Sequence, residues 1–96
     1  MTTKPTIGLG IIGCGNIANA YFKGASIFEV LEVAACADIN MDAAIAKAEE
    51  HGCQAQTVDE LLANPEVELV INLTIPSVHA EVSLKALNAG KHVYSE

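Results

Sequence analysis

The chain has 96 residues, of which 51% are hydrophobic and 18% charged, and 12 acidic against 5 basic side chains give a formal net charge of −7. This length fits one small domain with its own core, and the scarcity of Lys and Arg excludes an extended nucleic-acid surface. We find neither a signal-peptide pattern nor an apolar run of about 18 residues, so we expect a cytoplasmic protein without membrane or nucleic-acid partners.

The chain opens with a predicted strand followed by a predicted helix. The run Ile7-Gly-Leu-Gly-Ile-Ile12 is apolar and rich in β-branched residues, as in a strand that is covered on both faces. After it, small and apolar residues recur at helical spacing, namely Ile17, Ala20, Tyr21, Gly24, Ala25 and Phe28. The first unit is therefore strand, turn and helix.

The middle of the chain repeats this order. Residues 30–37 predict a second buried strand, and the following helix has Asn40 as its N-cap and Gly52 beyond its C-terminus. Residues 53–56 predict a third strand. Thr57-Val-Asp-Glu60 has the spacing of a capping box, which predicts the start of another short helix.

The last third of the chain completes the alternation. Residues 67–73 predict a fourth strand, residues 77–89 a helix that Gly90 closes, and residues 91–96 the beginning of a fifth strand. Strands that alternate with helices over short connections predict an α/β fold with a doubly wound parallel sheet of the Rossmann type. In such folds the ligand binds at the carboxyl ends of the strands.

The segment GLGIIGCGNIA contains two overlapping matches to the dinucleotide fingerprint G-x-G-x-x-[GA]. The first match, which begins at Gly8 and Gly10, lies inside the first strand, and no strand precedes it to feed a phosphate-binding turn. We therefore expect Gly8 and Gly10 to allow close packing of that strand. The second match begins where the strand ends and finishes in the first turn of the helix, as the fingerprint requires.

Each position of the second match has an expected role. Gly13 would permit the tight turn, Gly15 would let a pyrophosphate approach the backbone, and Ala18 would let the helix pack closely on the strand. The backbone amides near Asn16 and Ile17, which have no partner at a helix N-terminus, would face the phosphates. The match therefore predicts a dinucleotide site, although the two glycines would also suit a simple turn.

An acidic residue is expected about 20 positions after such a loop, where it accepts hydrogen bonds from the ribose hydroxyls. Asp38 follows Ala18 by 20 residues, at the end of the second strand. Residues 39–41 include no Arg or Lys that would neutralise a 2′-phosphate, so we expect NAD as the cofactor in preference to NADP. Alternatively, Asp38 would cap the next helix or would simply be a solvated residue at the end of the strand.

The three cysteines, Cys14, Cys36 and Cys53, indicate neither a disulfide framework nor a zinc site. Their number is odd and no two have C-x-x-C spacing. Cys14 occupies an unconstrained position of the fingerprint. We expect reduced thiols and no metal.

Several segments together resemble the Gfo/Idh/MocA family, the glucose-fructose oxidoreductase and inositol 2-dehydrogenase group of NAD(P)-dependent enzymes. They are GIIGCGNIA, the strand-end pair Ala37-Asp38, DELLANPEVELV and AEVSLKALNAGKHVYSE. The resemblance covers almost the whole chain. It implies hydride transfer between a nicotinamide cofactor and a sugar, inositol or related polyol, by a protein that forms homo-oligomers at full length.

The resemblance also implies further cofactor-pocket residues. Thr74, Pro76 and His79 match the family's Thr-Pro pair and following His, with Ile75 interposed before the proline. Pro76 would equally serve only to begin a helix, and His79 would equally be an exposed first-turn residue. Glu96 aligns with the family's Glu-Lys-Pro motif, near the nicotinamide.

By the same resemblance, the motif's lysine and a second, substrate-binding domain would follow Glu96. We therefore expect residues 1–96 to be a truncated nucleotide-binding domain with no catalytic residue and no turnover of its own. Three other interpretations remain: a non-catalytic NAD(P)-binding sensor, a methyltransferase-like domain that binds S-adenosylmethionine, and a structural domain without a ligand. Fold alone does not distinguish them.

Overall fold

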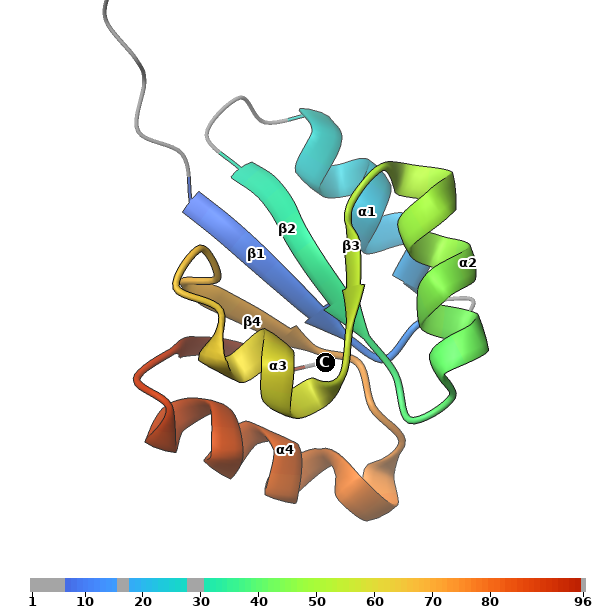
Figure 1. Ribbon diagram of the computed structural model, residues 1–96. Helices are drawn as coiled ribbons and strands as arrows, with labels where there is room; N and C mark the ends of the chain where they lie inside the picture. The colour runs from blue at the N-terminus through green and yellow to red at the C-terminus, as the bar shows by residue number, and fades with distance from the viewer. Residues whose placement is uncertain (1–6, 16–17, 28–30, 96) are drawn as a thin grey trace, which may run out of the picture.

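The computed structural model describes residues 7–15, 18–27 and 31–95, in which strands and helices alternate (Figure 1). Every element predicted from the sequence is present, although the fourth strand is shorter than the predicted range 67–73. The strands are β1 (Ile7–Ile12), β2 (Leu31–Ala37), β3 (Gln54–Gln56), β4 (Leu69–Asn72) and β5 (His92–Ser95). The helices are α1 (Ala18–Ile27), α2 (Met41–His51), α3 (Val58–Ala63) and α4 (Pro76–Asn88).

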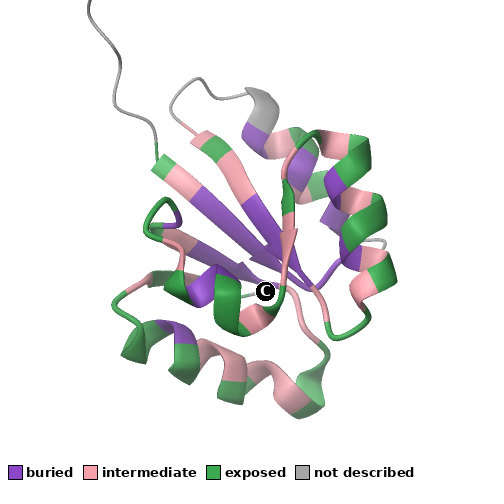
Figure 2. Ribbon diagram, viewed as in Figure 1, coloured by how far each residue is buried: buried purple, intermediate pink, exposed green. Residues whose placement is uncertain are grey.

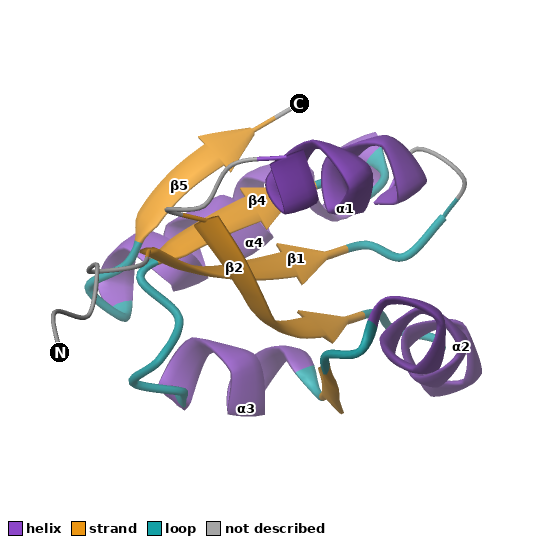
Figure 3. Ribbon diagram, turned by 90° about the horizontal axis from the view of Figure 1, so that it is seen from above, coloured by secondary structure: helices purple, strands orange, loops and turns teal. Residues whose placement is uncertain are grey.

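The five strands form one parallel sheet in the order β3-β2-β1-β4-β5. Figure 3 shows β3 and β5 at opposite edges of this sheet. The chain winds from β1 to β3 in one direction and then crosses to β4 on the other side of β1. Connections leave β1 and β4 in opposite directions, which opens a crevice at the carboxyl ends of these strands. The predicted Rossmann-type fold is confirmed.

Helices cover both faces of the sheet, with α1 and α2 on one face and α3 and α4 on the other. Consecutive strand residues point to opposite faces, so Ile11 packs under α1 and α2 while Ile12 packs under α3 and α4. Figure 2 shows the buried central strands between these helical layers. Burial on both sides explains why the central strands β1, β2 and β4 are mostly apolar.

The first fingerprint match is a packing feature of β1. A β carbon at Gly8 would overlap the backbone carbonyl oxygen of Glu66, and one at Gly10 would lie 2.7 Å from Leu61 Cδ2 and 2.8 Å from Val67 Cγ1. These distances leave no room for a side chain. The absence of side chains at Gly8 and Gly10 therefore lets α3 and the turn before β4 lie directly against β1.

The helix ends follow the sequence signals. The Asn40 side chain accepts a hydrogen bond from the N–H of Asp42, and Gly52 ends α2 in the left-handed conformation, with φ of 74°. Thr57 and Glu60 form both hydrogen bonds of a capping box at the start of α3. The longest helix, α4, has 13 residues, and the part of the chain that the structure describes contains no helix long and apolar enough to cross a bilayer.

Candidate functional site

The turn after β1 has the backbone that a phosphate-binding loop requires. Gly13 has φ of 105°, a conformation that side chains other than hydrogen disfavour, and its N–H donates to the carbonyl oxygen of Ala37 at 2.8 Å. A β carbon at Gly13 would lie 2.8 Å from the carbonyl carbon and oxygen of Leu73. By contrast, a β carbon at Gly15 would meet no atom within 4 Å. Gly13 is thus fixed by the fold, whereas the space above Gly15 is open.

The third residue of the fingerprint, Ala18, is the first residue of α1 and is fully buried. Its N–H donates to the Gly15 carbonyl oxygen at 3.1 Å, which closes the turn that leads into the helix. Asn16 and Ile17, which were expected to present their amides to the phosphates, lie outside the described residues. The described part of the loop has the strand, turn and helix context of the fingerprint.

The Asp38 carboxylate lies beside the turn after β1 and links that turn to the connection between β2 and α2. Its Oδ2 accepts a hydrogen bond from the N–H of Cys14 at 2.7 Å, and its Oδ1 accepts one from the N–H of Asn40 at 2.8 Å. Each carboxylate oxygen has two lone pairs, so both oxygens keep capacity to accept a ligand hydroxyl. These bonds hold Asp38 next to the glycine loop.

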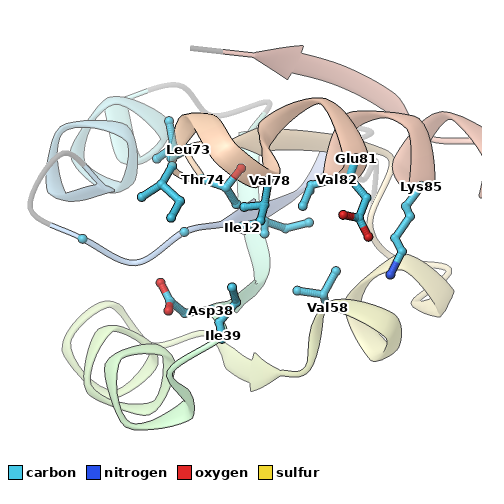
Figure 4. Close-up of a pocket in the computed structure, with 13 residues that line it drawn as sticks. Ile12, Asp38, Ile39, Val58, Leu73, Thr74, Val78, Glu81, Val82 and Lys85 are labelled. Carbon is cyan, nitrogen blue, oxygen red and sulfur yellow. The ribbon is translucent and has the colours of Figure 1, made fainter.

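A cavity of about 400 Å³ opens at the carboxyl ends of the strands, within the range of small-molecule sites. Four of the predicted site residues, Gly13, Gly15, Asp38 and Thr74, line it together. Figure 4 shows this lining, to which the connections after β1, β2 and β4 and the helices α3 and α4 contribute. The other lining residues, which were not predicted, are Ile12, Ile39, Val58, Leu73, Ile75, Val78, Glu81, Val82 and Lys85.

Thr74 is held at the cavity by Asn72, the only polar residue among the described residues that is buried completely. Asn72 Oδ1 accepts hydrogen bonds from the Thr74 N–H at 3.1 Å and the Thr74 hydroxyl at 2.6 Å. Asn72 Nδ2 donates to the His79 carbonyl oxygen at 2.8 Å and to Ser83 Oγ at 2.9 Å. One amide at the end of β4 therefore fixes both the following turn and the first two turns of α4.

Replacing Asn72 by alanine is expected to lower the free energy of unfolding by about 3 kcal/mol, because it removes four hydrogen bonds and leaves their partly buried partners unsatisfied. Urea unfolding followed by circular dichroism measures this loss. Asn88→Ala is the matched control, since Asn88 is exposed at the end of α4. Equal effects of the two substitutions would show that the network adds no stability.

Three further predicted site residues, Pro76, His79 and Glu96, are not among the described residues that line the cavity. Pro76 is the exposed first residue of α4, and His79 directs its Nε2 to the Asn72 carbonyl oxygen at 3.1 Å. Neither of them lines the cavity. Glu96 lies outside the described residues. The assignment of these three residues to the cofactor pocket stays a prediction.

The three thiols lie on the face of the sheet that α1 and α2 cover. The Cys53 Sγ is 3.8 Å from the Cys36 Sγ, and the described residues that line the cavity include no cysteine. The hydrogen bond with Cys14 raises the pKa of Cys36 to about 12, and burial adds to the shift. The hydrogen bond with Cys36 lowers the pKa of Cys14, whose side chain is only 4% exposed and thus shielded from reagents. In the ranges that the structure describes, no His, Cys, Asp and Glu side chains group as a metal site.

The open space above Gly15 and the carboxylate of Asp38 are the two features that a dinucleotide needs here. A close approach of the pyrophosphate requires a position without a side chain, and the ribose requires an acceptor at the end of β2. Both features border the same cavity. The residues present therefore fit a nicotinamide dinucleotide at this site.

Comparison with known proteins agrees with this geometry. The model of an oxidoreductase family with an NAD-binding Rossmann fold, Gfo/Idh/MocA, matches residues 7–96. An inositol 2-dehydrogenase from Rhizobium meliloti is 30% identical over 91 residues, which cover 95% of this chain. Another inositol 2-dehydrogenase, from Gluconacetobacter diazotrophicus, is 35% identical over 95 residues, also 95% of the chain.

Solved structures show the same similarity. KijD10, a 3-ketoreductase from Actinomadura kijaniata solved with NADP and TDP-benzene, aligns over 94% of this chain with a TM-score of 0.87 and 32% sequence identity. The chain spans 28% of the length of this protein and of both dehydrogenases. The match over residues 7–96 shows that the chain belongs to the Gfo/Idh/MocA family of oxidoreductases, as its NAD-binding Rossmann domain.

Proposed function

We propose that this chain binds NAD for an oxidoreductase that transfers a hydride between the nicotinamide and a sugar, inositol or related polyol. The observation that carries the proposal is that Gly13, Gly15, Asp38 and Thr74 all line the same cavity. The substrate class comes from the relatives, which include the two inositol 2-dehydrogenases described above. Because the relatives are longer, we propose that substrate binding and turnover require more than these 96 residues.

The residues that border the cavity have distinct proposed roles. The turn at Gly13 and the open position at Gly15 would admit the pyrophosphate, and Asp38 would accept hydrogen bonds from the adenosine ribose hydroxyls. The Thr74 hydroxyl, oriented by Asn72 Oδ1, would contact the cofactor from the β4 side. When bound, the nicotinamide accepts or donates the hydride.

We propose that Asp38 favours NAD over NADP. Its carboxylate would repel a 2′-phosphate, and the adjacent positions 39–41 supply no cationic side chain to offset that repulsion. The family as a whole does not decide this point, because KijD10 was solved with NADP. Calorimetric titration of the protein with NAD and NADP in parallel tests the proposal: tighter binding of NAD supports it, and tighter binding of NADP contradicts the role of Asp38.

Replacing Asp38 by alanine is expected to raise the Kd for NAD about ten- to hundredfold and to narrow the preference over NADP. The substitution removes both the acceptors for the ribose and the charge that repels a 2′-phosphate. Asp42→Ala, which changes the net charge equally at an exposed position outside the cavity, is the control. An unchanged ratio of the two affinities in Asp38→Ala would remove Asp38 from the ribose site.

A further inference from the structure

The cavity extends beyond the residues that would hold the pyrophosphate and ribose. Asp38, whose carboxylate is bonded to the glycine turn at Cys14, lies at one end of it (Figure 4). At the other end, Glu81 and Lys85 project from α4 toward the side of the cavity where α3 begins (Figure 4). Both side chains line the cavity, and both are exposed.

Between these two ends the lining is apolar. Ile39 contributes from the connection after β2, Val58 from the start of α3, and Val78 and Val82 from α4. Ile39 is 80% exposed, so its side chain is available to contact a ligand in the cavity. A ligand group that is apolar on its faces and polar at its far edge would match this arrangement.

A purine base has that character. Adenine presents a 6-amino donor and the N1 acceptor side by side on its Watson–Crick edge. A carboxylate only accepts hydrogen bonds, and an ammonium group only donates them. Residues four apart on a helix lie on the same face, so Glu81 and Lys85 together offer an acceptor and a donor to one ligand edge.

We propose that Glu81 and Lys85 recognise the adenine base of the cofactor, Glu81 by accepting from the 6-amino group and Lys85 by donating to N1. The inference rests on the proposed function, since it concerns the adenosine end of the same cavity. Hypoxanthine, with an oxygen at position 6 and an N–H at position 1, presents the reverse order of donor and acceptor. The pair therefore disfavours hypoxanthine and gives the site a preference among bases.

Titration of the purified protein with NAD and with nicotinamide hypoxanthine dinucleotide tests this inference. We expect NAD to bind about five- to tenfold more tightly, a modest ratio because both side chains are exposed to water. Glu81→Gln and Lys85→Gln should each reduce the ratio. The double exchange Glu81→Lys with Lys85→Glu should reverse it, because the order of donor and acceptor is then that of hypoxanthine.

Glu49→Gln is the matched control, because Glu49 is exposed on α2 and does not line the cavity. It should leave the ratio at the wild-type value. The inference is overturned if the double exchange retains the wild-type ratio or, should that variant not fold, if Glu81→Gln retains it. Absence of NAD binding to the wild-type protein overturns the proposed function, whereas NAD binding with no preference between the bases overturns only the inference about Glu81 and Lys85.

Discussion

Replacing Gly8 by alanine is expected to lower the free energy of unfolding by more than about 4 kcal/mol, enough to unfold many domains of this size. The added β carbon would overlap the backbone oxygen of Glu66. The obstacle is backbone, so no rotamer change relieves the clash, and β1 must move away from the segment before β4. Urea unfolding followed by circular dichroism measures the effect.

Gly24→Ala is the control for Gly8→Ala. Gly24 lies within α1, and a β carbon there meets no atom within 4 Å. Alanine favours a helix interior over glycine, so the same chemical change should raise the free energy of unfolding by about 1 kcal/mol. If Gly8→Ala were as stable as the wild-type protein, this result would contradict the close packing of β1 against the Glu66 carbonyl.

Replacing Gly15 by valine is expected to raise the Kd for NAD more than about 100-fold while the chain stays folded. The open space above Gly15 is where the pyrophosphate would approach the backbone, and a branched side chain would fill it. Calorimetry with NAD measures the affinity. Urea unfolding should show a change within about 0.5 kcal/mol, as for a substitution that contacts nothing.

Gly15→Ala provides a graded comparison, because a single methyl group obstructs less than an isopropyl group. Its Kd should lie between those of the wild-type protein and of Gly15→Val. An unchanged NAD affinity in Gly15→Val, with the chain folded, would contradict the assignment of the loop to the pyrophosphate. A loss of both stability and affinity would mean that Gly15 has a packing role that the open space around it does not suggest.

The sequence was sufficient to predict the fold and to separate the two fingerprint matches. Periodicity located the central strands β1, β2 and β4, because they are mostly buried and apolar, and turn and capping residues such as Gly52, Thr57 and Gly90 bounded the more exposed edge strands β3 and β5. The order of elements then distinguished Gly8 and Gly10, which lie within β1, from Gly13 and Gly15, which follow it. Local rules succeed here because the turn and its flanking elements are adjacent in the chain.

The far end of the cavity could not be predicted in this way. Val58, Glu81 and Lys85 lie on α3 and α4, and only the tertiary arrangement of these helices brings them to one cavity. On the sequence alone, Glu81 and Lys85 are two ordinary charges on an amphipathic helix. Asn72 was also missed, because an asparagine at a strand end gives no sign that it is buried and bonded to the next helix.

The two hydrogen bonds of Asp38 have a consequence for changing the cofactor of this protein by design. Its oxygens bind the amides of Cys14 and Asn40, so the residue that we propose for the ribose also fastens the glycine loop to the start of α2. A basic residue introduced for NADP would leave both amides without their acceptor. We therefore expect redesign toward NADP to succeed best when a short acceptor side chain is kept at position 38 and the positive charge is introduced at a neighbouring position.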